Sequence, residues 1–306
     1  MNAALVLALA MALDAQVGEP RWLWSRLPHP AVLMGRAVGW LDTHLNTGPN
    51  ARTRGVLVVA LLVGGAALIG WTIAQAGWVI ELLVAAILLA HRSLVSHVAA
   101  VAHGLRQSVD EGRRAVAMIV SRDVSASSPS QVARAGIESL SENFSDGVIA
   151  PAFWFLIGGV PGILIYKVVN TADSMIGYLT PRHAAFGWAA ARLDDVLNWI
   201  PARLTGALFA AIGGVARDWP NISNDARLHK SPNAGWPEAA MARALNIALA
   251  GPRSYHGKVE DLAWVNASGQ QELRPADIDA ALSMVWKAWG LTVGLLGLVG
   301  VIFWVF

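Results

Sequence analysis

The sequence predicts an all-α fold, that of a polytopic helical membrane protein, and three observations support this. Only 14% of the 306 residues are charged and 55% are hydrophobic, whereas a soluble domain carries about a quarter charged residues. The mean hydropathy is positive, at +0.47. Two uncharged runs, residues 55–76 and 288–306, are each long enough to cross a hydrocarbon core of about 30 Å as a helix. We therefore expect one membrane-integrated domain over residues 1–306, with cytosolic excursions at about 106–147 and 218–279.

The composition also excludes some kinds of chemistry. The chain has no cysteine, so neither disulfides nor thiolate nucleophiles or metal ligands are available. Its net charge is only +2, which fits basic loops on the inner side of a membrane better than a nucleic-acid surface. We expect membrane lipid as a partner and no nucleic acid.

The first third of the chain predicts a short helix and a helical hairpin. Residues 1–13 are apolar but lack the Lys/Arg start of a signal peptide, which favours a retained membrane helix. An amphipathic segment follows at about 31–46. The run 55–76 and a second helix from Trp78 to about Leu105 flank a turn at Gly77. Arginines beyond both outer ends would place the open ends of the hairpin in the cytosol.

The middle of the chain predicts a capped helix and then a broken one. Ser128, Pro129 and Gln131 form a helix start with a capping box, and that helix should run to about Phe144. The apolar run 148–169 contains three glycines and Pro161 at its centre, which favours a broken or re-entrant pair of half-helices. Irregular backbone at membrane depth survives where it is buried in protein or lines a polar cavity, so this break is the first indication of a site.

Beyond the break, the pattern predicts two more helices. One is apolar and covers residues 199–215. The other begins at Pro237 and runs to Leu249. The stretch 251–275 shows no clear pattern and reads as a loop.

Three polar clusters lie around the broken segment. In the first, Glu138, Glu142 and Asp146 recur every four residues, so a continuous helix would place three carboxylates on one face. Such carboxylates repel one another unless a cation lies between them. The alternative is a solvated helix face, and Gly147 could end the helix before Asp146 joins the row.

The second and third clusters combine acids with amides. Asn170 and Asp173 follow the second half-helix, while Asp194, Asp195 and Asn198 precede the next apolar segment. Oxygen-rich sets of this kind suit Mg²⁺, and magnesium in turn usually accompanies a phosphate-bearing substrate. The alternative is structural pairing of the two adjacent acids with arginines on either side of them.

Basic residues near these acids are candidate phosphate ligands, although each alone also fits an inside anchor. They are Lys167, Arg182, Arg192, Arg203, His229 and Lys230. The chain has no glycine-rich Walker loop, so a nucleotide would bind in a different arrangement.

These motifs, in their order along the chain, resemble the adenosylcobinamide-phosphate synthase family, the CobD/CbiB proteins of cobalamin biosynthesis. The resemblance covers nearly the whole chain apart from the stretch 251–275. The matching stretches are Gly18-Glu19-Pro20, His29-Pro30, Met34-Gly35-Arg36, SRDVS at 121–125, GIESLSENFSDG at 136–147, YKVVNTADSMIGY at 166–178, FGWAAARLDDVLNWIPARL at 186–204 and HKSPNAGWPEAAMA at 229–242.

The resemblance implies a multi-pass ligase of the bacterial inner membrane whose active face is cytosolic. Such enzymes use ATP to join (R)-1-amino-2-propanol, or its O-phosphate, to the free propionate of adenosylcobyric acid. Mg²⁺ and ATP are then the expected cofactors, and the two substrates the expected partners. Other late cobalamin-pathway enzymes and a second copy of the chain are compatible partners.

For that reaction we expect three groups of site residues. The acids that do the chemistry would be Glu138, Glu142, Asp146, Asp173, Asp194 and Asp195, of which Glu142, Asp194 and Asp195 are the metal ligands. The residues that complete the metal shell or hold ATP phosphates would be Asn143, Lys167, Asn170, Arg192, Asn198, Arg203 and Lys230.

The residues alone leave three other interpretations open. An intramembrane prenyl- or phosphoalcohol transferase also uses paired acids with Mg²⁺ at a membrane mouth. A transporter would use a broken helix with polar groups at mid-membrane, but the acids here lie at the ends of the apolar runs. A non-catalytic membrane scaffold predicts that neutralising Asp194 or Asp195 leaves pathway flux intact.

Overall fold

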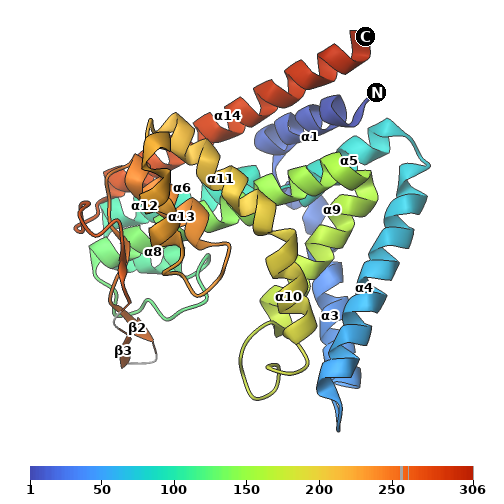
Figure 1. Cartoon of the computed structure of the whole chain (residues 1–306), viewed down its shortest axis with the longest axis horizontal. Coiled ribbons are helices and arrows are strands. Elements are labelled where there is room, and N and C mark those ends of the chain that lie inside the picture. The colour runs from blue at the N-terminus through green and yellow to red at the C-terminus, as the bar shows by residue number, and fades with distance from the viewer. Residues whose placement is uncertain (256–257, 261, 306) are drawn as a thin grey trace. The chain divides into compact units, whose positions relative to one another are not determined.

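A computed structural model describes residues 1–255, 258–260 and 262–305 (Figure 1). Helices make up most of it, and the β-structure in these ranges consists of strands of two or three residues. Within the described ranges, four helical segments are long and apolar enough to cross a membrane: Ala51–Ala74, Trp78–Gln107, Pro129–Ile176 and Pro275–Phe303. The predicted class, an all-α protein with several candidate membrane spans, is confirmed.

The chain divides into two compact units, each built from separate stretches of sequence. Unit 1 comprises Met1–Ala90, Ala150–Asn198 and Val293–Phe306, and unit 2 comprises His91–Ile149 and Trp199–Thr292. The backbone therefore passes from one unit to the other four times. The expected single membrane-integrated domain with two cytosolic excursions stays a prediction.

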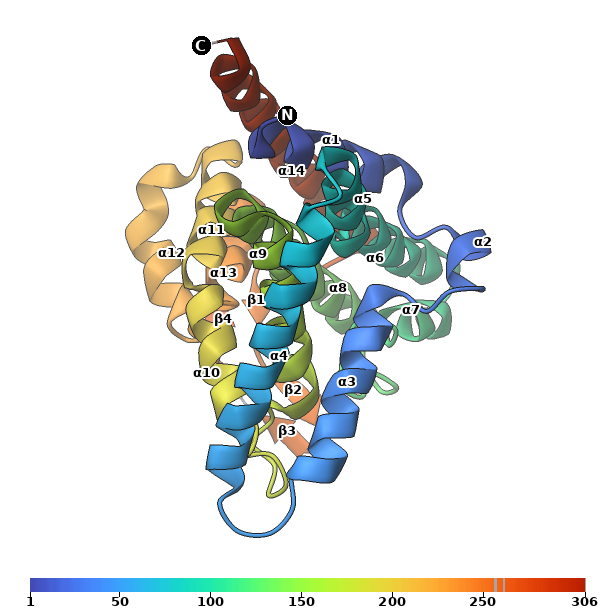
Figure 2. The same ribbon diagram turned by 90° about the vertical axis from the view of Figure 1, so that its right-hand side faces the viewer.

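Unit 1 is built around one long helix, α9 (Ala150–Ile176), on which the other main helices of the unit pack. Figure 2 shows α3 and α4 running alongside it. The other helices of the unit are α1 (Ala3–Val17), α2 (Arg21–Trp24), α3 (Pro30–Leu45), α4 (Ala51–Ala74), α5 (Trp78–Leu88) and α10 (Trp188–Leu197).

The two ends of the chain meet within unit 1. The side-chain amide of Asn2, which caps α1, donates a hydrogen bond of 2.7 Å to the carbonyl of Gly300. Gly300 belongs to the last turns of α14 (Pro275–Val305), and a Cβ there would lie 2.5 Å from Leu5. The absence of a side chain at Gly300 therefore lets the two terminal helices touch.

The hairpin turns where the sequence predicts it, at Gly77. This residue has φ 91°, a left-handed conformation that glycine adopts without steric cost. On one arm of the hairpin, α4 passes very close to α9, since a Cβ on Gly70 would lie 2.6 Å from the Cα of Pro161. The second arm is less regular than expected, because Leu89 is extended and separates α5 from α6 (His91–Gln107).

The predicted break lies inside α9. Gly159 has φ 57° and ψ −146°, outside the helical region, and Pro161 follows two residues later. Pro161 lacks the N–H that a continuous helix would need, and only glycine reaches the backbone angles found at 159 readily. The segment is therefore two half-helices joined by a kink.

Unit 2 packs α6, α8 (Pro129–Phe144) and α13 (Gly235–Ala244) together. The capping box predicted at the start of α8 is present, since the Ser128 hydroxyl and the Gln131 side chain each accept from the other residue's backbone N–H. Its remaining elements are α7 (Val109–Val116), η1 (Ser145–Ile149), α11 (Trp199–Ile212), η2 (Ala216–Asp218), α12 (Trp219–Ala226), β1 (Leu249–Ala250), β2 (Arg253–Tyr255), β3 (Lys258–Glu260), β4 (Trp264–Val265) and α14 up to Thr292.

In the last third of the chain, one predicted helix end and one predicted loop are wrong. The helix expected from Pro237 to Leu249 ends at Ala244, because Asn246 adopts a left-handed φ of 54° and Leu249–Ala250 pairs instead with Trp264–Val265. The stretch 251–275, expected to be a loop, contains the antiparallel strands β2 and β3 as well as β4. The final helix also begins earlier than its apolar run, at Pro275.

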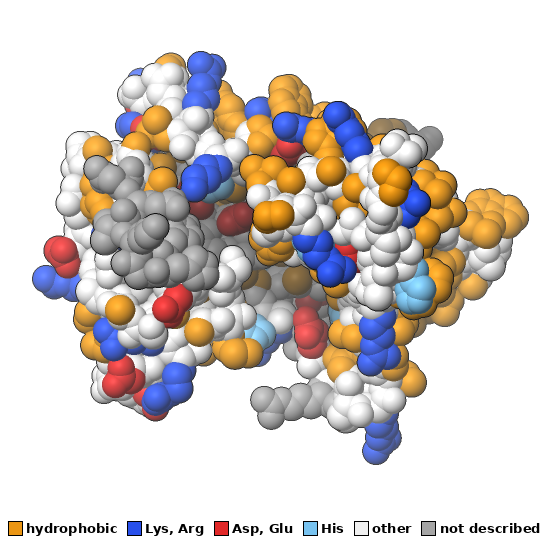
Figure 3. All heavy atoms as spheres, turned by 90° about the horizontal axis from the view of Figure 1, so that it is seen from below, with side chains coloured by type: hydrophobic (Ala, Val, Ile, Leu, Met, Phe, Trp, Pro, Cys, Tyr) orange, Lys and Arg blue, Asp and Glu red, His pale blue; other side chains and the backbone are white. Residues whose placement is uncertain are grey.

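Large apolar side chains are exposed along the candidate spans, as expected for surfaces that face lipid. On α4 they include Leu57, Leu61, Leu68 and Ile69, and on α14 they include Leu298. Figure 3 shows a face of the molecule on which charged side chains of both signs lie among apolar ones.

Candidate functional site

The carboxyl group of Asp194 is the centre of a hydrogen-bonded cluster in unit 1. Asp194 lies on α10, where its Oδ1 accepts from the Asn170 amide on α9 at 3.2 Å. Its Oδ2 accepts from the Asn198 amide at 3.0 Å. Together with Asp173 and Asp195, whose charges act on Asp194, these residues form what we call the acid–amide cluster.

Two further side chains fix this cluster against α9. The hydroxyl of Tyr166, which is fully buried, donates to Asn198 Oδ1 at 2.9 Å. The indole N–H of Trp154, on the first half-helix, donates to the carbonyl of Leu197 at 3.0 Å. Residues on both sides of the α9 break therefore hold the end of α10, and the kink is part of the scaffold of the cluster.

Burial and the negative charge of neighbouring acids both raise the pKa of Asp194. Desolvation by burial is the largest cause that raises the pKa of Asp194 to about 7, and the negative charges of Asp173 and Asp195 raise it further against the two amide hydrogen bonds. Burial also raises the pKa of Asp195, and Arg192 opposes that shift. A cation placed here would relieve an unfavourable accumulation of carboxylates.

Of the basic residues expected near these acids, Arg192 forms an ion pair with one of them. Arg192, which is largely exposed, donates from Nη1 to Asp195 Oδ2 at 3.2 Å. Structural ion pairing is therefore present at Asp195, whereas Asp194 bonds to amides. Lys167 lies on α9, four residues before Thr171, whose hydroxyl donates to the Lys167 carbonyl at 2.7 Å.

Mg²⁺ fits the acid–amide cluster only when a phosphate-bearing ligand supplies part of its coordination shell. Among the residues that the structure describes, no three His, Asp or Glu side chains lie close enough together to hold a metal ion. Mg²⁺ is often held by only one or two carboxylates, with substrate phosphates and waters completing its shell. The oxygen donors around Asp194 thus suit Mg²⁺ that arrives with a phosphate-bearing ligand, and do not suit a cage made of protein groups alone.

The three evenly spaced acids of unit 2, Glu138, Glu142 and Asp146, differ in how deeply they are buried. Glu138 is buried, accepting from Arg122 Nη2 at 3.0 Å and from the backbone N–H of Ala250 at 2.8 Å. Glu142 is only half buried. After Phe144, the α-helix gives way to the π-helical turn η1, which contains the half-buried Asp146. Glu138 therefore joins α8 to the chain at β1, while the later two acids lie nearer the surface.

The remaining predicted residues of unit 2 are spread over three elements. Asn143 is exposed and donates to the Ser139 carbonyl at 2.8 Å. Arg203 lies between the indole rings of Trp199 and Trp236, 4.3 and 4.7 Å from their centres. Lys230 is exposed in the turn before α13.

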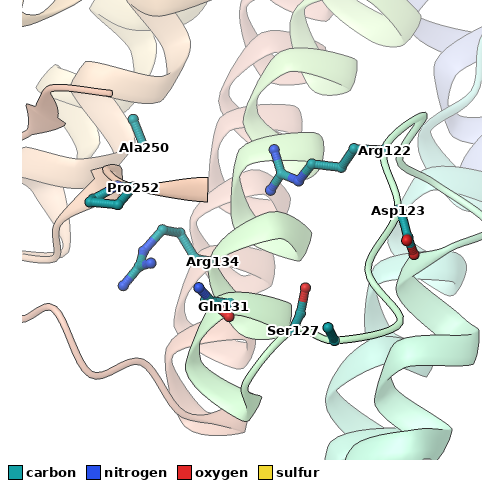
Figure 4. Close-up of a pocket in the computed structure, with 8 residues that line it drawn as sticks. Arg122, Asp123, Ser127, Gln131, Arg134, Ala250 and Pro252 are labelled. Atoms are coloured by element: carbon teal, nitrogen blue, oxygen red, sulfur yellow. The ribbon is translucent and has the colours of Figure 1, made fainter. Parts of the chain in front are cut away.

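His229, one of the basic candidates, and two residues outside the expected set, Glu238 and Arg122, also occupy notable positions in unit 2. His229 Nε2 lies 3.8 Å from an oxygen of the buried Glu238. His229 Nδ1 accepts from the Ser231 N–H at 3.0 Å, which places the ring proton on the nitrogen that faces the glutamate. Arg122, in the matched stretch 121–125, lines a small pocket of about 60 Å³ with Arg134 (Figure 4).

Sequence signals for these residues exist but are weak. His229 was one of six basic candidates, and Glu238 lies in the same matched stretch, nine residues later. Tyr166 precedes Asn170 by one helical turn, so the pair shares a face of α9. None of these spacings reveals by itself which partner each side chain meets.

Comparisons with known proteins place the chain in a family. A family model described as CobD/Cbib protein matches residues 7–285. The protein named Cobalamin biosynthesis protein CobD from Brucella suis biovar 1 (strain 1330) is 46% identical over 310 residues, covering 95% of each chain. Its namesake from Rhodobacter capsulatus is 43% identical over 312 residues, covering 99% of each. No solved structure matches. The chain therefore belongs to the CobD/CbiB family.

Proposed function

We propose that this protein acts in cobalamin biosynthesis as an ATP-dependent amide ligase. It would attach (R)-1-amino-2-propanol, or its O-phosphate, to the free propionate of adenosylcobyric acid, giving adenosylcobinamide or its phosphate. The similarity to proteins named for cobalamin biosynthesis extends over nearly the full length of both chains. The observation that carries the chemical part of the proposal is the half-buried acid–amide cluster around Asp194, which suits a magnesium–phosphate complex.

The reaction needs activation because a carboxylate would have to expel oxide. In the first step, a propionate oxygen attacks the γ-phosphorus of ATP, the bond to the β–γ bridging oxygen breaks, and ADP leaves. In the second step, the amine nitrogen attacks the acyl phosphate carbon and phosphate leaves with the former propionate oxygen. The proton lost from the amine must pass to a base.

We assign the metal–phosphate end of this chemistry to unit 1. Asp194 and Asp195 would hold Mg²⁺, with Asn170 and Asn198 nearby to complete its surroundings. The ion would supply positive charge to the transferring phosphoryl group. Lys167 and Arg192, from α9 and α10, would add to that charge, because positioning and electrostatics dominate phosphoryl transfer.

A base for the amine proton is available on α9. Asp173 lies three residues after Asn170 and close enough to Asp194 to act on its charge, and its ionised carboxylate could accept the proton. Gly177 leaves room for it, since a Cβ at that position would collide with the Asp173 carboxylate. Asp146 of unit 2 is the second candidate for this role.

The groups of unit 2 are assigned to the same reaction. Glu142 would contribute to metal binding, and Glu138, with its bonds to Arg122 and Ala250, would position the helix that carries Glu142. Asn143, Arg203 and Lys230 would contact phosphate or carboxylate groups of the substrates. Basic residues outside the ends of the hairpin favour a cytosolic active face at the bacterial inner membrane.

The proposal is tested with protein purified in detergent. We would incubate it with adenosylcobyric acid, aminopropanol or its phosphate, Mg²⁺ and ATP, and follow products by mass spectrometry. The expected result is a corrinoid heavier by the condensed amine, formed with release of ADP and strongly reduced in Asp194→Asn and Glu142→Gln. Arg217→Gln, at an exposed site remote from the cluster in sequence, serves as the control for a lost charge.

Other results would point elsewhere. Well-folded protein that gives no product with either amine would exclude a lone ligase. A prenyl or nucleotide-linked alcohol consumed instead would favour an intramembrane transferase. If Asp194→Asn sustains normal cobalamin production in cells, a scaffold role is the better explanation.

A further inference from the structure

Unit 1 contains an apolar groove that the proposed reaction does not use. Its volume is about 490 Å³, and it lies among α3, α4, α5 and α9. The floor includes Ala66 and Leu88, both buried, whereas the rim includes Leu33, Leu61 and Ile69. Apart from glycine, every residue that lines the groove has an apolar side chain.

The groove opens onto the outer face of a candidate membrane span. Its longest wall is α4, a helix of 24 residues that is long and apolar enough to cross a membrane. On that wall, Leu61 is 52% exposed and Ile69 is 58% exposed, so side chains of the rim also belong to the outer face of the span. The groove is therefore continuous with the exposed apolar face of α4, the face that would contact the hydrocarbon core if α4 spans the membrane.

Hydrocarbon is the chemistry that this groove can recognise. Water needs two to four polar partners to settle in a cavity, and apolar cavities of comparable character stay dry. An apolar chain instead gains dispersion contacts with every wall. At the depth of α4, the surrounding medium supplies acyl chains at high concentration.

We propose that the groove binds one acyl chain of a membrane phospholipid, held between α3 and α4 as a lasting part of unit 1. Such a lipid differs from the boundary layer around the protein because helices enclose it on several sides. Its class is a diacyl phospholipid with one chain inserted in the groove.

The bound chain would touch the back of the helix that carries the acid–amide cluster. Leu164 and Val168 line the groove, while Asn170 and Asp173 belong to the cluster and Tyr166 donates a hydrogen bond to it. At about 100° per residue, these two sets lie on opposite faces of α9. A filled groove therefore supports the second half-helix behind the residues that hold Asp194.

Two neighbouring glycines allow a matched test. On both Gly64 and Gly65, a Cβ would meet nothing within 4 Å, so each position accepts a side chain without a clash. Gly65 lines the groove and Gly64 does not. Gly65→Phe should fill the groove, while Gly64→Phe adds the same ring to the same helix elsewhere.

We would extract each variant from membranes in a mild detergent, wash away loosely held lipid, and record native mass spectra. Wild type and Gly64→Phe should retain one phospholipid per chain, and Gly65→Phe should lose at least nine-tenths of it. A phospholipid with a photoreactive acyl chain should crosslink to peptides of residues 61–73 or 164–168 in the first two proteins only.

Three outcomes would overturn the proposal. These are wild-type protein that retains no phospholipid even when phospholipid is added back, equal retention by Gly65→Phe, or retention of an isoprenoid in place of the phospholipid. If Gly65→Phe does not give a monodisperse protein, Gly65→Leu fills the same space with a smaller side chain and takes its place.

Discussion

Asp194 shows how much of this candidate site depends on a single carboxyl group. It is half-buried, takes hydrogen bonds from two amides, and faces the negative charges of Asp173 and Asp195. Each of these features can be tested through its effect on proton binding or on stability, without an assay for the reaction.

The pH dependence of stability should reflect Asp194. Because its pKa rises to about 7 in the folded protein from an ordinary value of 3.8, the folded state binds a proton more tightly than the unfolded state. Its contribution to stability is therefore complete below about pH 4 and is lost as pH rises through 7. Thermal unfolding in detergent without Mg²⁺ should show Tm falling over this range.

The Asp194→Asn variant should flatten that decline, because the group that titrates is gone. Added Mg²⁺ should raise the Tm of wild type near pH 7 and have less effect on the variant. An identical pH profile in wild type and variant would contradict the assignment of this titration to Asp194.

The buried bond from Tyr166 gives a second test at this scale. Tyr166→Phe removes the hydroxyl that donates to Asn198 Oδ1 and leaves a buried acceptor without that donor. Such a loss costs about 1–3 kcal/mol, so the free energy of unfolding should fall by that amount in chemical denaturation. A change below about 0.5 kcal/mol would mean that water or another donor replaces the hydroxyl.

Sequence reasoning at the residue scale succeeded where partners are close along the chain. Asp194 and Asn198 are one helical turn apart, and their hydrogen bond follows from that spacing. The pattern Glu138, Glu142, Asp146 suggested equivalent acids, yet Glu138 bonds to Ala250, which is 112 residues away. Nothing local to Glu138 indicates that partner.

At the scale of elements, the break in α9 can be tested by substituting a single residue. Gly159 occupies φ 57° and ψ −146°, a region almost restricted to glycine. Gly159→Ala should therefore destabilise the protein by about 1–3 kcal/mol, because it must either strain the backbone or straighten the helix.

The residue before it is a matched control. Gly158 is helical and a Cβ there would meet nothing within 4 Å, so Gly158→Ala should leave stability unchanged or raise it slightly. Chemical denaturation of both variants measures the difference. Equal effects of the two substitutions would mean that the kink does not depend on the glycine at 159.

Elements with strong local signals were predicted well, and those set by distant pairing were not. The helix start at Ser128, the turn at Gly77 and the break near Pro161 each follow from residues that are neighbours along the chain. The end of α13 depends instead on Asn246 adopting a left-handed conformation and on pairing between β1 and β4. Short two-stranded pairings leave little pattern in the sequence.

At the scale of the whole molecule, the chain passes back and forth between its two units, and this determines which fragments can fold when they are expressed alone. Residues 1–198 contain most of unit 1 but only the 91–149 part of unit 2. We expect this fragment, expressed alone, to aggregate or be degraded, because unit 2 then lacks more than half of its residues and exposes apolar surface.

Co-expression of residues 1–198 with 199–306 as separate chains should restore a monodisperse complex. Fluorescence-detected size-exclusion chromatography on a tagged fragment distinguishes the two cases. A monodisperse 1–198 fragment without its complement would show that the 91–149 part folds independently of the later segments.

The contact between Asn2 and Gly300 has a consequence for how the protein is made. The first helix is translated well before the residue that its cap contacts, which lies 298 residues later in the chain. Until residue 300 is translated, the N-terminal helix must wait with one flank unmatched. A chain that stalls before residue 300 would keep that flank open, which gives membrane proteases a way to distinguish it from copies in which the contact has formed.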